Sequence, residues 1–104
     1  MAVFTVTKEN IKTEVINSEK TVLLDFWAPW CAPCRMISPV IEQIADEVSD
    51  INIKVGKINV DDEQELALEF EVMSIPTLVV FKNGKIVKKS IGVKSKAAIL
   101  EMLK

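Results

Sequence analysis

The fold of this chain is decided by residues 21–34, which read TVLLDFWAPWCAPC. The first half, Thr21–Trp27, is apolar at both alternating sets of positions, as expected for a central strand that is covered on both faces. The residues after the second half place apolar side chains at helical spacing, which predicts a long helix. Its expected apolar stripe consists of Met36, Ile37, Val40, Ile41, Ile44, Ala45 and Val48. The stretch is therefore a strand-to-helix junction.

Both cysteines of the chain, Cys31 and Cys34, lie at this junction. A disulfide between them would close a very short loop, and the chain-entropy relation gives about 2 kcal/mol for it, against ~4–5 kcal/mol for a loop of domain size. The pair is therefore a weak structural cross-link. It is well suited to a dithiol that opens and closes while it exchanges two electrons.

Composition removes several other uses of a cysteine pair. A tetrahedral zinc site needs four Cys, His or acidic ligands, normally with two such pairs, whereas this chain has one pair and no histidine. The lack of histidine also excludes a Cys–His nucleophile. A copper chaperone with a two-cysteine loop remains open. The net charge of −2 argues against a nucleic-acid binder, which would carry a basic excess.

Length and hydropathy predict a single domain that spans residues 1–104. A domain of this size has a free energy of unfolding of about 5–15 kcal/mol. No apolar run approaches the ~20 residues that span a bilayer, and the first residues lack the basic segment and apolar block of a secretory signal. These features predict a soluble protein of the cytoplasm with no membrane partner, where a disulfide is usually transient.

Strands and helices are expected to alternate along the rest of the chain. Further strands are predicted at Val3–Val6, Ile51–Val60, Thr77–Phe81 and Lys85–Ile91, the last two as a hairpin that turns at Gly84. Three more helices are predicted: one from Lys8 with Ile11, Val15 and Ile16 on one side, one through Phe70 with Asp61 and Gln64 as a capping pair, and one capped by Ser95 that contains Ala98, Leu100 and Leu103. This order predicts an α/β fold, with a mixed sheet and helices on both faces.

The junction assigns different roles to the two cysteines. Cys31 ends the turn and Cys34 lies in the first helical turn, so unpaired backbone N–H groups point toward the Cys31 sulfur. These dipoles favour its thiolate by roughly 0.3–2 kcal/mol, which lowers its pKa by about 0.2–1.5. We therefore expect Cys31 to be the exposed nucleophile and Cys34 the resolving thiol. Pro33 fits this turn because a first-turn proline has no N–H to lose.

Asp25 is unusual in a strand that is apolar on both faces. Burial makes its ionised form costly and should raise its pKa, and the alternative is an edge or hydrogen-bonded aspartate. Lys57, in the next predicted strand, is by itself typical of an exposed strand residue. Trp27 is expected in the core, whereas Trp30, beside the nucleophile, is expected in an exposed apolar rim that partners cover.

Several motifs resemble those of the thioredoxin family and follow one another in its order over essentially the full chain. They are FWAPWCAPCRM at 26–36, Pro39, SIPTL at 74–78 and FKNG at 81–84. The resemblance implies the thioredoxin fold, a mixed five-stranded sheet flanked on both faces by four helices. It also implies a general protein-disulfide reductase whose Cys31–Cys34 pair is re-reduced by an NADPH-dependent flavoenzyme, thioredoxin reductase.

The same resemblance implies roles for individual residues. Asp25 would relay protons to and from Cys34, and Lys57 would tune the charge of Asp25. The peptide before Pro76 would be cis, and the backbone of Ile75 would pair with extended substrate. The implied substrate-binding rim comprises Trp30, Met73, Ser74, Ile75, Pro76, Gly92 and Val93. Ala32 and Pro33, between the cysteines, would tune the redox potential, and both Ala32 and Ser74 stand where the family most often has glycine.

The resemblance implies no bound cofactor or metal, with NADPH used only indirectly through the reductase. The implied partners are thioredoxin reductase and disulfide-containing proteins of the ribonucleotide reductase, peroxiredoxin and methionine sulfoxide reductase types, and the chain itself would be a monomer. Two alternatives stay open. One is a thiol oxidase or isomerase on the same fold, which differs in redox potential, and the other is a non-enzymatic binding subunit that docks through the rim.

Overall fold

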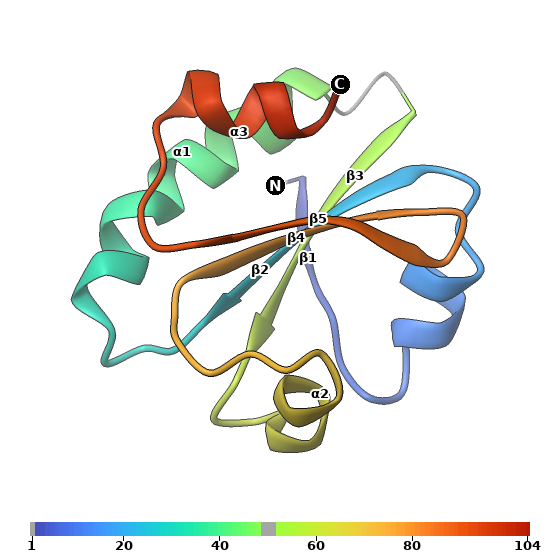
Figure 1. Ribbon diagram of the computed structural model, residues 1–104, viewed down its shortest axis with the longest axis horizontal. Helices are drawn as coiled ribbons and strands as arrows, with labels where there is room; N and C mark the ends of the chain where they lie inside the picture. Colours follow the sequence, from blue (N-terminus) through green and yellow to red (C-terminus); the bar gives the residue numbers. More distant parts are fainter. Residues whose placement is uncertain (1, 49–51) are drawn as a thin grey trace.

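The strand predicted at residues 21–27 forms at those positions and is the centre of the sheet. A computed structural model describes residues 2–48 and 52–104 (Figure 1). Strand β2 (Thr21–Trp27) lies between β3 (Ile53–Asn59) and β4 (Thr77–Lys82), with β1 (Val3–Thr5) and β5 (Lys85–Ile91) at the two edges. Residues 22–26 are all buried, because both faces of β2 are covered.

The sheet is mixed, as the sequence predicts. Strands β1 and β2 run parallel to β3, β4 runs antiparallel to β2, and β5 runs antiparallel to β4. The β2–β3 register places Asp25 beside Lys57. The β4–β5 hairpin turns at Asn83 and Gly84, whose φ angles are 54° and 76°. Two residues with positive φ form the kind of turn that matches the twist of paired strands.

Four helical segments of the described chain cover the two faces of the sheet (Figure 1). Helices α1 (Ala32–Val48) and α3 (Lys96–Met102) pack on one face, and α2 (Gln64–Glu69) and the short π-helical segment η1 (Lys12–Ile16) pack on the other. The first face buries Leu23, Ile37, Ile41, Ile44, Ala45, Val48, Val55, Leu78, Val80, Ile99 and Leu103. The second buries Val6, Val15, Val22, Leu24, Phe26, Ile58, Leu66, Val79 and Phe81.

Strand β2 supplies side chains to both of these clusters. Leu23 belongs to the cluster under α1 and α3, whereas Val22 and Leu24 belong to the cluster under η1 and α2. Each fully buried aliphatic or aromatic side chain contributes about 1.5–3 kcal/mol of hydrophobic stabilisation. The continuous apolar run of residues 22–24 is therefore explained by a strand that must fill two cores.

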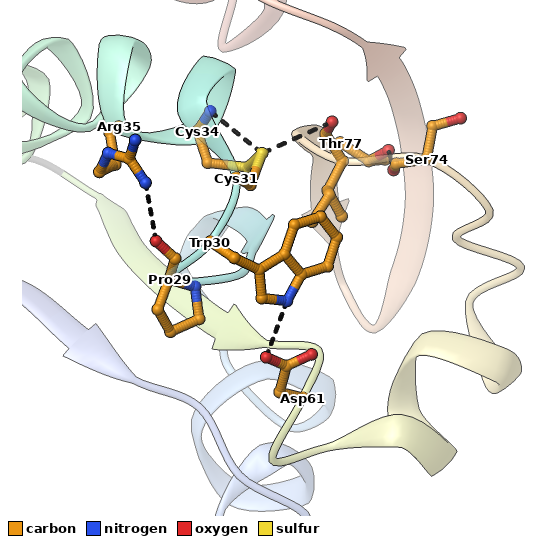
Figure 2. Close-up of a disulfide and its surroundings, with 9 residues drawn as sticks. Pro29, Trp30, Cys31, Cys34, Arg35, Asp61, Ser74 and Thr77 are labelled. Atoms are coloured by element: carbon orange, nitrogen blue, oxygen red, sulfur yellow. Dashed lines mark hydrogen bonds between the residues drawn. A yellow bond between two sulfur atoms is a disulfide. The ribbon is translucent and has the colours of Figure 1, made fainter.

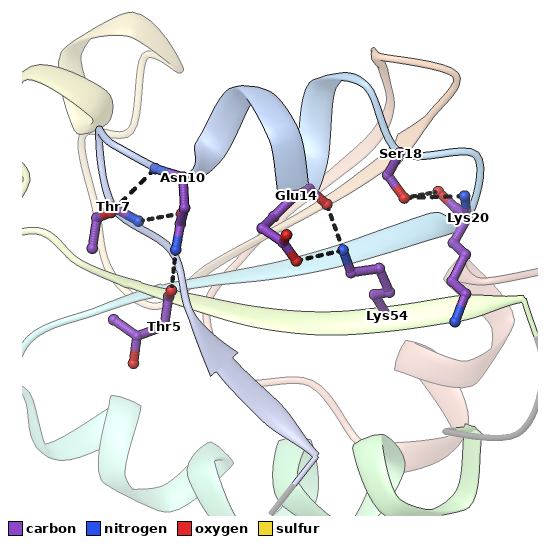
Figure 3. Close-up of polar contacts among 7 residues, drawn as sticks. All are labelled: Thr5, Thr7, Asn10, Glu14, Ser18, Lys20 and Lys54. Carbon is purple, nitrogen blue, oxygen red and sulfur yellow. Dashed lines mark hydrogen bonds and ion pairs between the residues drawn. The ribbon is translucent and has the colours of Figure 1, made fainter.

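The helix predicted to begin at Lys8 begins later, because residues 7–10 form a turn that the Asn10 side chain holds (Figure 3). The Asn10 side-chain oxygen accepts a hydrogen bond from the N–H of Thr7 at 2.8 Å, an arrangement that competes with helix formation. Ile51, the predicted first residue of the third strand, lies outside the described residues.

Three apolar side chains named in the predicted helices are exposed. Met36 is 69% exposed and Ile16 is 36% exposed, and Ala98 is also exposed. Successive helical residues point about 100° apart, so Met36 lies outside the arc that the buried residues of α1 share. In α3 the core side is set by Ile99 and Leu103, which leaves Ala98 outside it for the same reason.

The capping pair predicted for α2 does not form. The N-cap residue is Glu63, whose side chain makes no capping hydrogen bond. The carboxylate of Asp61 instead accepts the indole N–H of Trp30. At α3 the prediction is confirmed, because the Ser95 hydroxyl accepts a backbone N–H of the first turn at 3.1 Å.

A partly buried lysine joins η1 to the sheet (Figure 3). The ammonium of Lys54, on β3, donates to the backbone oxygen of Glu14 at 2.8 Å and to its carboxylate at 2.9 Å. The same ammonium lies 4.9 Å from the ring centroid of Phe4. These contacts hold η1 against β3, where Val15 enters the core.

Gly56 on β3 lies where a neighbouring chain segment approaches closely. A Cβ at this position would lie 2.8 Å from Cγ2 of Val6 and 3.0 Å from Cζ of Phe4. Val6 is fully buried, and its β-branched side chain has little freedom to move aside. We expect Gly56→Ala to lower the free energy of unfolding by about 1–3 kcal/mol, measured by urea denaturation followed by tryptophan fluorescence.

Val6→Ala provides the matched test, because it removes the methyl group that the new Cβ would meet. The effects of the two substitutions should be less than additive in the double variant. An unchanged urea midpoint for Gly56→Ala would contradict the close approach.

Candidate active site

The two cysteines lie where β2 ends and α1 begins (Figure 2). The N–H of Cys34 donates to the Cys31 sulfur at 3.2 Å, as Figure 2 shows. The N–H of Cys31 donates to the carbonyl oxygen of Ala28 at 3.1 Å. A disulfide joins the two residues, whose Cα atoms are 5.3 Å apart. Ala32 and Pro33 are exposed in the first turn of α1. The prediction that a helical N–H group points at the Cys31 sulfur is confirmed.

The predicted exposure of Cys31 is wrong for the disulfide state. Only 4% of Cys31 and 2% of Cys34 is exposed, because Ala28 and Ile75 pack against the pair. The carbonyl oxygen of Ile75 lies 3.8 Å from the Cys31 sulfur. A disulfide sulfur carries no hydrogen, so this contact can become a hydrogen bond only when Cys31 is a thiol.

A cavity of about 90 Å³ lies behind the disulfide, and Asp25 lines it. Asp25 is 4% exposed and belongs to the central strand, so it is not an edge residue. Its Oδ1 makes no hydrogen bond with any residue that the structure describes. The other lining residues are Trp27, Cys34, Arg35, Ser38 and Lys57. Asp25 and Cys34 therefore line the same cavity, which is large enough to admit water.

Burial raises the pKa of Asp25 from 3.8 to about 7, and the positive charge of Lys57 opposes this rise. The rise agrees with the prediction from sequence. Lys57 is not the exposed strand residue that its position alone suggested, because it is partly buried beside Asp25. A carboxyl group with a pKa near neutrality can both accept and donate a proton at physiological pH.

Trp27 forms a wall of the same cavity. The ammonium of Lys57 lies 5.2 Å from the centroid of its ring. Trp27 is partly buried and packs against the cysteine pair, so the predicted core position is confirmed only in part. Its indole N–H is buried and has no hydrogen-bond partner within residues 2–48 and 52–104.

A groove of about 340 Å³ lies next to the cysteine pair. Trp30 is 68% exposed and forms part of it, and its indole N–H donates to the Asp61 carboxylate at 2.9 Å (Figure 2). The other lining residues are Val60, Gln64, Ala67, Leu68, Val72, Met73, Ser74 and Ile75. The groove thus brings together four residues of the predicted rim: Trp30, Met73, Ser74 and Ile75.

The remaining rim residues adjoin Pro76. The Ile75–Pro76 peptide is cis, as the resemblance implies, and Pro76 is buried. The N–H of Gly92 donates to the carbonyl oxygen of Pro76 at 2.8 Å. The next residue, Val93, is 48% exposed. Gly92 and Val93 therefore lie beside Pro76 without lining the groove.

Sequence reasoning missed a contact of Lys89 at the end of α2, and it missed one residue of the groove. Leu68 lines it and is 78% exposed. A signal was present, because Leu66 and Leu68 are two residues apart in a helix and cannot both face the core. The ammonium of Lys89, on β5, donates to the carbonyl oxygens of Phe70 at 3.1 Å and Glu71 at 2.9 Å, at the end of α2. The contact of Lys89 depends on the tertiary arrangement of β5 and α2, which no local sequence pattern predicts.

Among residues 2–48 and 52–104, no group of three or more His, Cys, Asp or Glu side chains could hold a metal ion. No helix in this part of the chain is long and apolar enough to cross a membrane.

Comparison with known proteins covers nearly the whole chain. The sequence profile of the thioredoxin family matches residues 2–104. A thioredoxin of Bacillus subtilis is 48% identical over 99% of this chain and 96% of that protein. A thioredoxin of Mycobacterium tuberculosis is 48% identical over 98% of this chain and 87% of that protein. A Mycobacterium leprae protein named bifunctional thioredoxin reductase/thioredoxin is 47% identical over 94% of this chain and 21% of that protein.

Burial of Asp25 should make the stability of the protein depend on pH. Below about pH 4 the carboxyl group is protonated in both the folded and the unfolded state, whereas between about pH 4 and pH 7 only the folded state keeps the proton. Above about pH 7 both states are ionised, and the folded state carries the full cost of the buried charge. The rise from 3.8 to about 7 corresponds to roughly 4 kcal/mol. The free energy of unfolding should therefore fall across this range.

Asp25→Asn should remove that pH dependence. We expect the substitution to raise the free energy of unfolding of the disulfide form by up to about 4 kcal/mol at pH 8 and to change it little at pH 4, measured by urea denaturation. Glu19→Gln is the control, because Glu19 is an exposed carboxylate. If Asp25→Asn raised the free energy of unfolding equally at pH 4 and pH 8, the raised pKa of Asp25 would be contradicted.

Proposed function

The chain belongs to the thioredoxin family, whose members are thiol–disulfide oxidoreductases, and we propose that it acts as a general protein-disulfide reductase. The observation that carries the proposal is the Cys31–Cys34 disulfide at the N-terminal end of α1, where the N–H of Cys34 donates to the Cys31 sulfur. The same N–H would stabilise a Cys31 thiolate after reduction. The family match sets aside the copper-chaperone alternative.

In the first step, the thiolate of Cys31 attacks one sulfur of an exposed substrate disulfide. The substrate S–S bond breaks, a mixed disulfide with Cys31 forms, and the second substrate sulfur leaves as a thiolate. Lowering a thiol pKa from ~8.5 to ~7 increases the rate only about three-fold, because the nucleophilicity of the thiolate falls as its fraction rises. Substrate positioning must therefore supply most of the acceleration.

In the second step, Cys34 attacks the Cys31 sulfur of the mixed disulfide. The bond between Cys31 and the substrate breaks, the substrate sulfur that Cys31 held leaves as a thiolate, and the Cys31–Cys34 disulfide forms again. Cys34 must first lose its proton, and we assign Asp25 as the base. The cavity that both residues line and the pKa of about 7 support this assignment. Lys57, beside Asp25, tunes the charge of that carboxyl group.

Substrate binding is assigned to the rim around the cysteines. An extended substrate segment pairs with the backbone of Ile75, next to Pro76, and covers the apolar groove. Recognition through main-chain hydrogen bonds places few demands on side chains, so the protein accepts many substrates. The other assigned rim residues are Trp30, Met73, Ser74, Gly92 and Val93.

Re-reduction is assigned to thioredoxin reductase, with NADPH used indirectly through that enzyme. The Mycobacterium leprae relative is named for both activities in one protein, which supports this pairing. Proteins of the ribonucleotide reductase, peroxiredoxin and methionine sulfoxide reductase types are the proposed substrates. We also propose that residues 1–104 act as one monomeric domain in the cytoplasm, because a disulfide that cycles needs reducing surroundings.

Two alternatives differ from this proposal in ways that can be measured. A thiol oxidase or isomerase would use the same residues at a higher redox potential, which Ala32 and Pro33 are proposed to tune. A non-enzymatic binding subunit would not need both cysteines. The presence of Cys31, Cys34 and Pro76 together favours an enzyme.

Cysteine variants test the two steps separately. Cys31→Ser should lower the rate of insulin reduction to that of dithiothreitol alone, because no nucleophile remains at the helix N-terminus. Cys34→Ser should accumulate the mixed disulfide with a substrate protein, which mass spectrometry can detect. Insulin reduction that persists in Cys31→Ser would reject the mechanism.

A glutathione titration of the Cys31–Cys34 couple tests the direction of electron flow. For a reductase we expect a redox potential of about −270 mV, the value known for thioredoxin. The substitution Ala32→Gly should shift the redox potential of the couple. A potential near about −120 to −180 mV would instead indicate an oxidase or isomerase.

A further inference from the structure

We propose that Met73 is an oxidation site, and that conversion of its thioether to the sulfoxide weakens substrate docking in the groove. Met73 is 94% exposed. It lines the groove together with Trp30, Leu68 and Ile75, next to the cysteine pair. The inference rests on the proposed function, because it concerns regulation of the same substrate-binding site.

The oxidation state of the cysteines determines which sulfur atoms an oxidant meets. In the disulfide state neither Cys31 nor Cys34 is a thiolate, and both residues are buried. The exposed thioethers are then the accessible reduced sulfur atoms of the described chain. Met73 is 94% exposed and Met36 is 69% exposed, whereas Met102 is partly buried. Met73 is therefore the methionine of this group that an oxidant in solution reaches most easily.

The reaction needs only a hydroperoxide as the oxidant. The Met73 sulfur attacks one oxygen of hydrogen peroxide, the O–O bond breaks, an S–O bond forms and water leaves. The sulfur is oxidised by two electrons and the peroxide is reduced by two, so no protein group has to donate or accept electrons. The product is methionine sulfoxide, which is polar and can be reduced back to methionine.

The location of Met73 gives this modification its effect. Most side chains that line the groove are apolar, so a sulfoxide there places a strong dipole where substrate and groove would otherwise exclude water. Leaving such a polar group without hydrogen-bond partners should raise the KM for a protein substrate by about three- to tenfold. Met36 undergoes the same chemistry but does not line the groove, so its oxidation should leave KM unchanged.

The experiment compares wild type, Met73→Leu and Met36→Leu in the disulfide form. Each protein is treated with hydrogen peroxide, and the reaction is stopped with catalase. Peptide mapping by mass spectrometry then follows sulfoxide formation at each methionine. The KM for insulin, with dithiothreitol as the electron donor, is compared with that of the same untreated variant. We expect Met73 to be oxidised before Met36, and KM to rise in wild type and Met36→Leu but not in Met73→Leu.

Two results would overturn the proposal. One is a Met73 thioether that persists while Met36 is oxidised, and the other is a rise in KM in Met73→Leu equal to that of wild type. Failure of the proposed function would look different, because untreated protein would not reduce insulin. The peptide map would still decide in that case whether Met73 is the preferred site.

Discussion

The turn between β2 and α1 has to present one sulfur to the free N–H groups of a helix and hold a second sulfur within bonding distance. The hydrogen bond from Cys34 N–H to the Cys31 sulfur meets the first condition, and the turn closed by Cys31 N–H and Ala28 O meets the second. Pro33 is tolerated because its position requires no donor. Every step assigned to this site uses a sulfur that this turn positions.

Asp25 shows that the site is not arranged for stability alone. An apolar residue would suit the centre of a doubly covered strand better, and the carboxyl group there has a pKa of about 7 because burial penalises its charge. Lys57 and Trp27 border the same cavity, and Lys57 relieves only part of that penalty. A destabilising group kept beside a reactive cysteine is typical of a functional position.

Periodicity and turn chemistry predict much of this fold from the sequence. Strand β2, the α1 stripe from Ile37 to Val48, the hairpin at Gly84 and the Ser95 cap all depend on local patterns, and all of them form. Two failures at α2 depend on the rest of the fold. Asp61 is predicted to cap α2, but its carboxylate accepts the indole N–H of Trp30 instead, and Leu68 faces the groove because Leu66 already fills the core side of α2. Such choices depend on tertiary packing.

The strand order also has a consequence for how copies of this chain meet. One edge strand of the sheet is β1, which has only three residues. The other edge strand is β5, whose exposed residues include Lys85, Lys88 and Lys89. A short edge strand and exposed lysines on an edge strand both discourage a second sheet from pairing edge to edge. Neither edge should therefore serve readily as a template on which further copies of the chain could stack at high concentration.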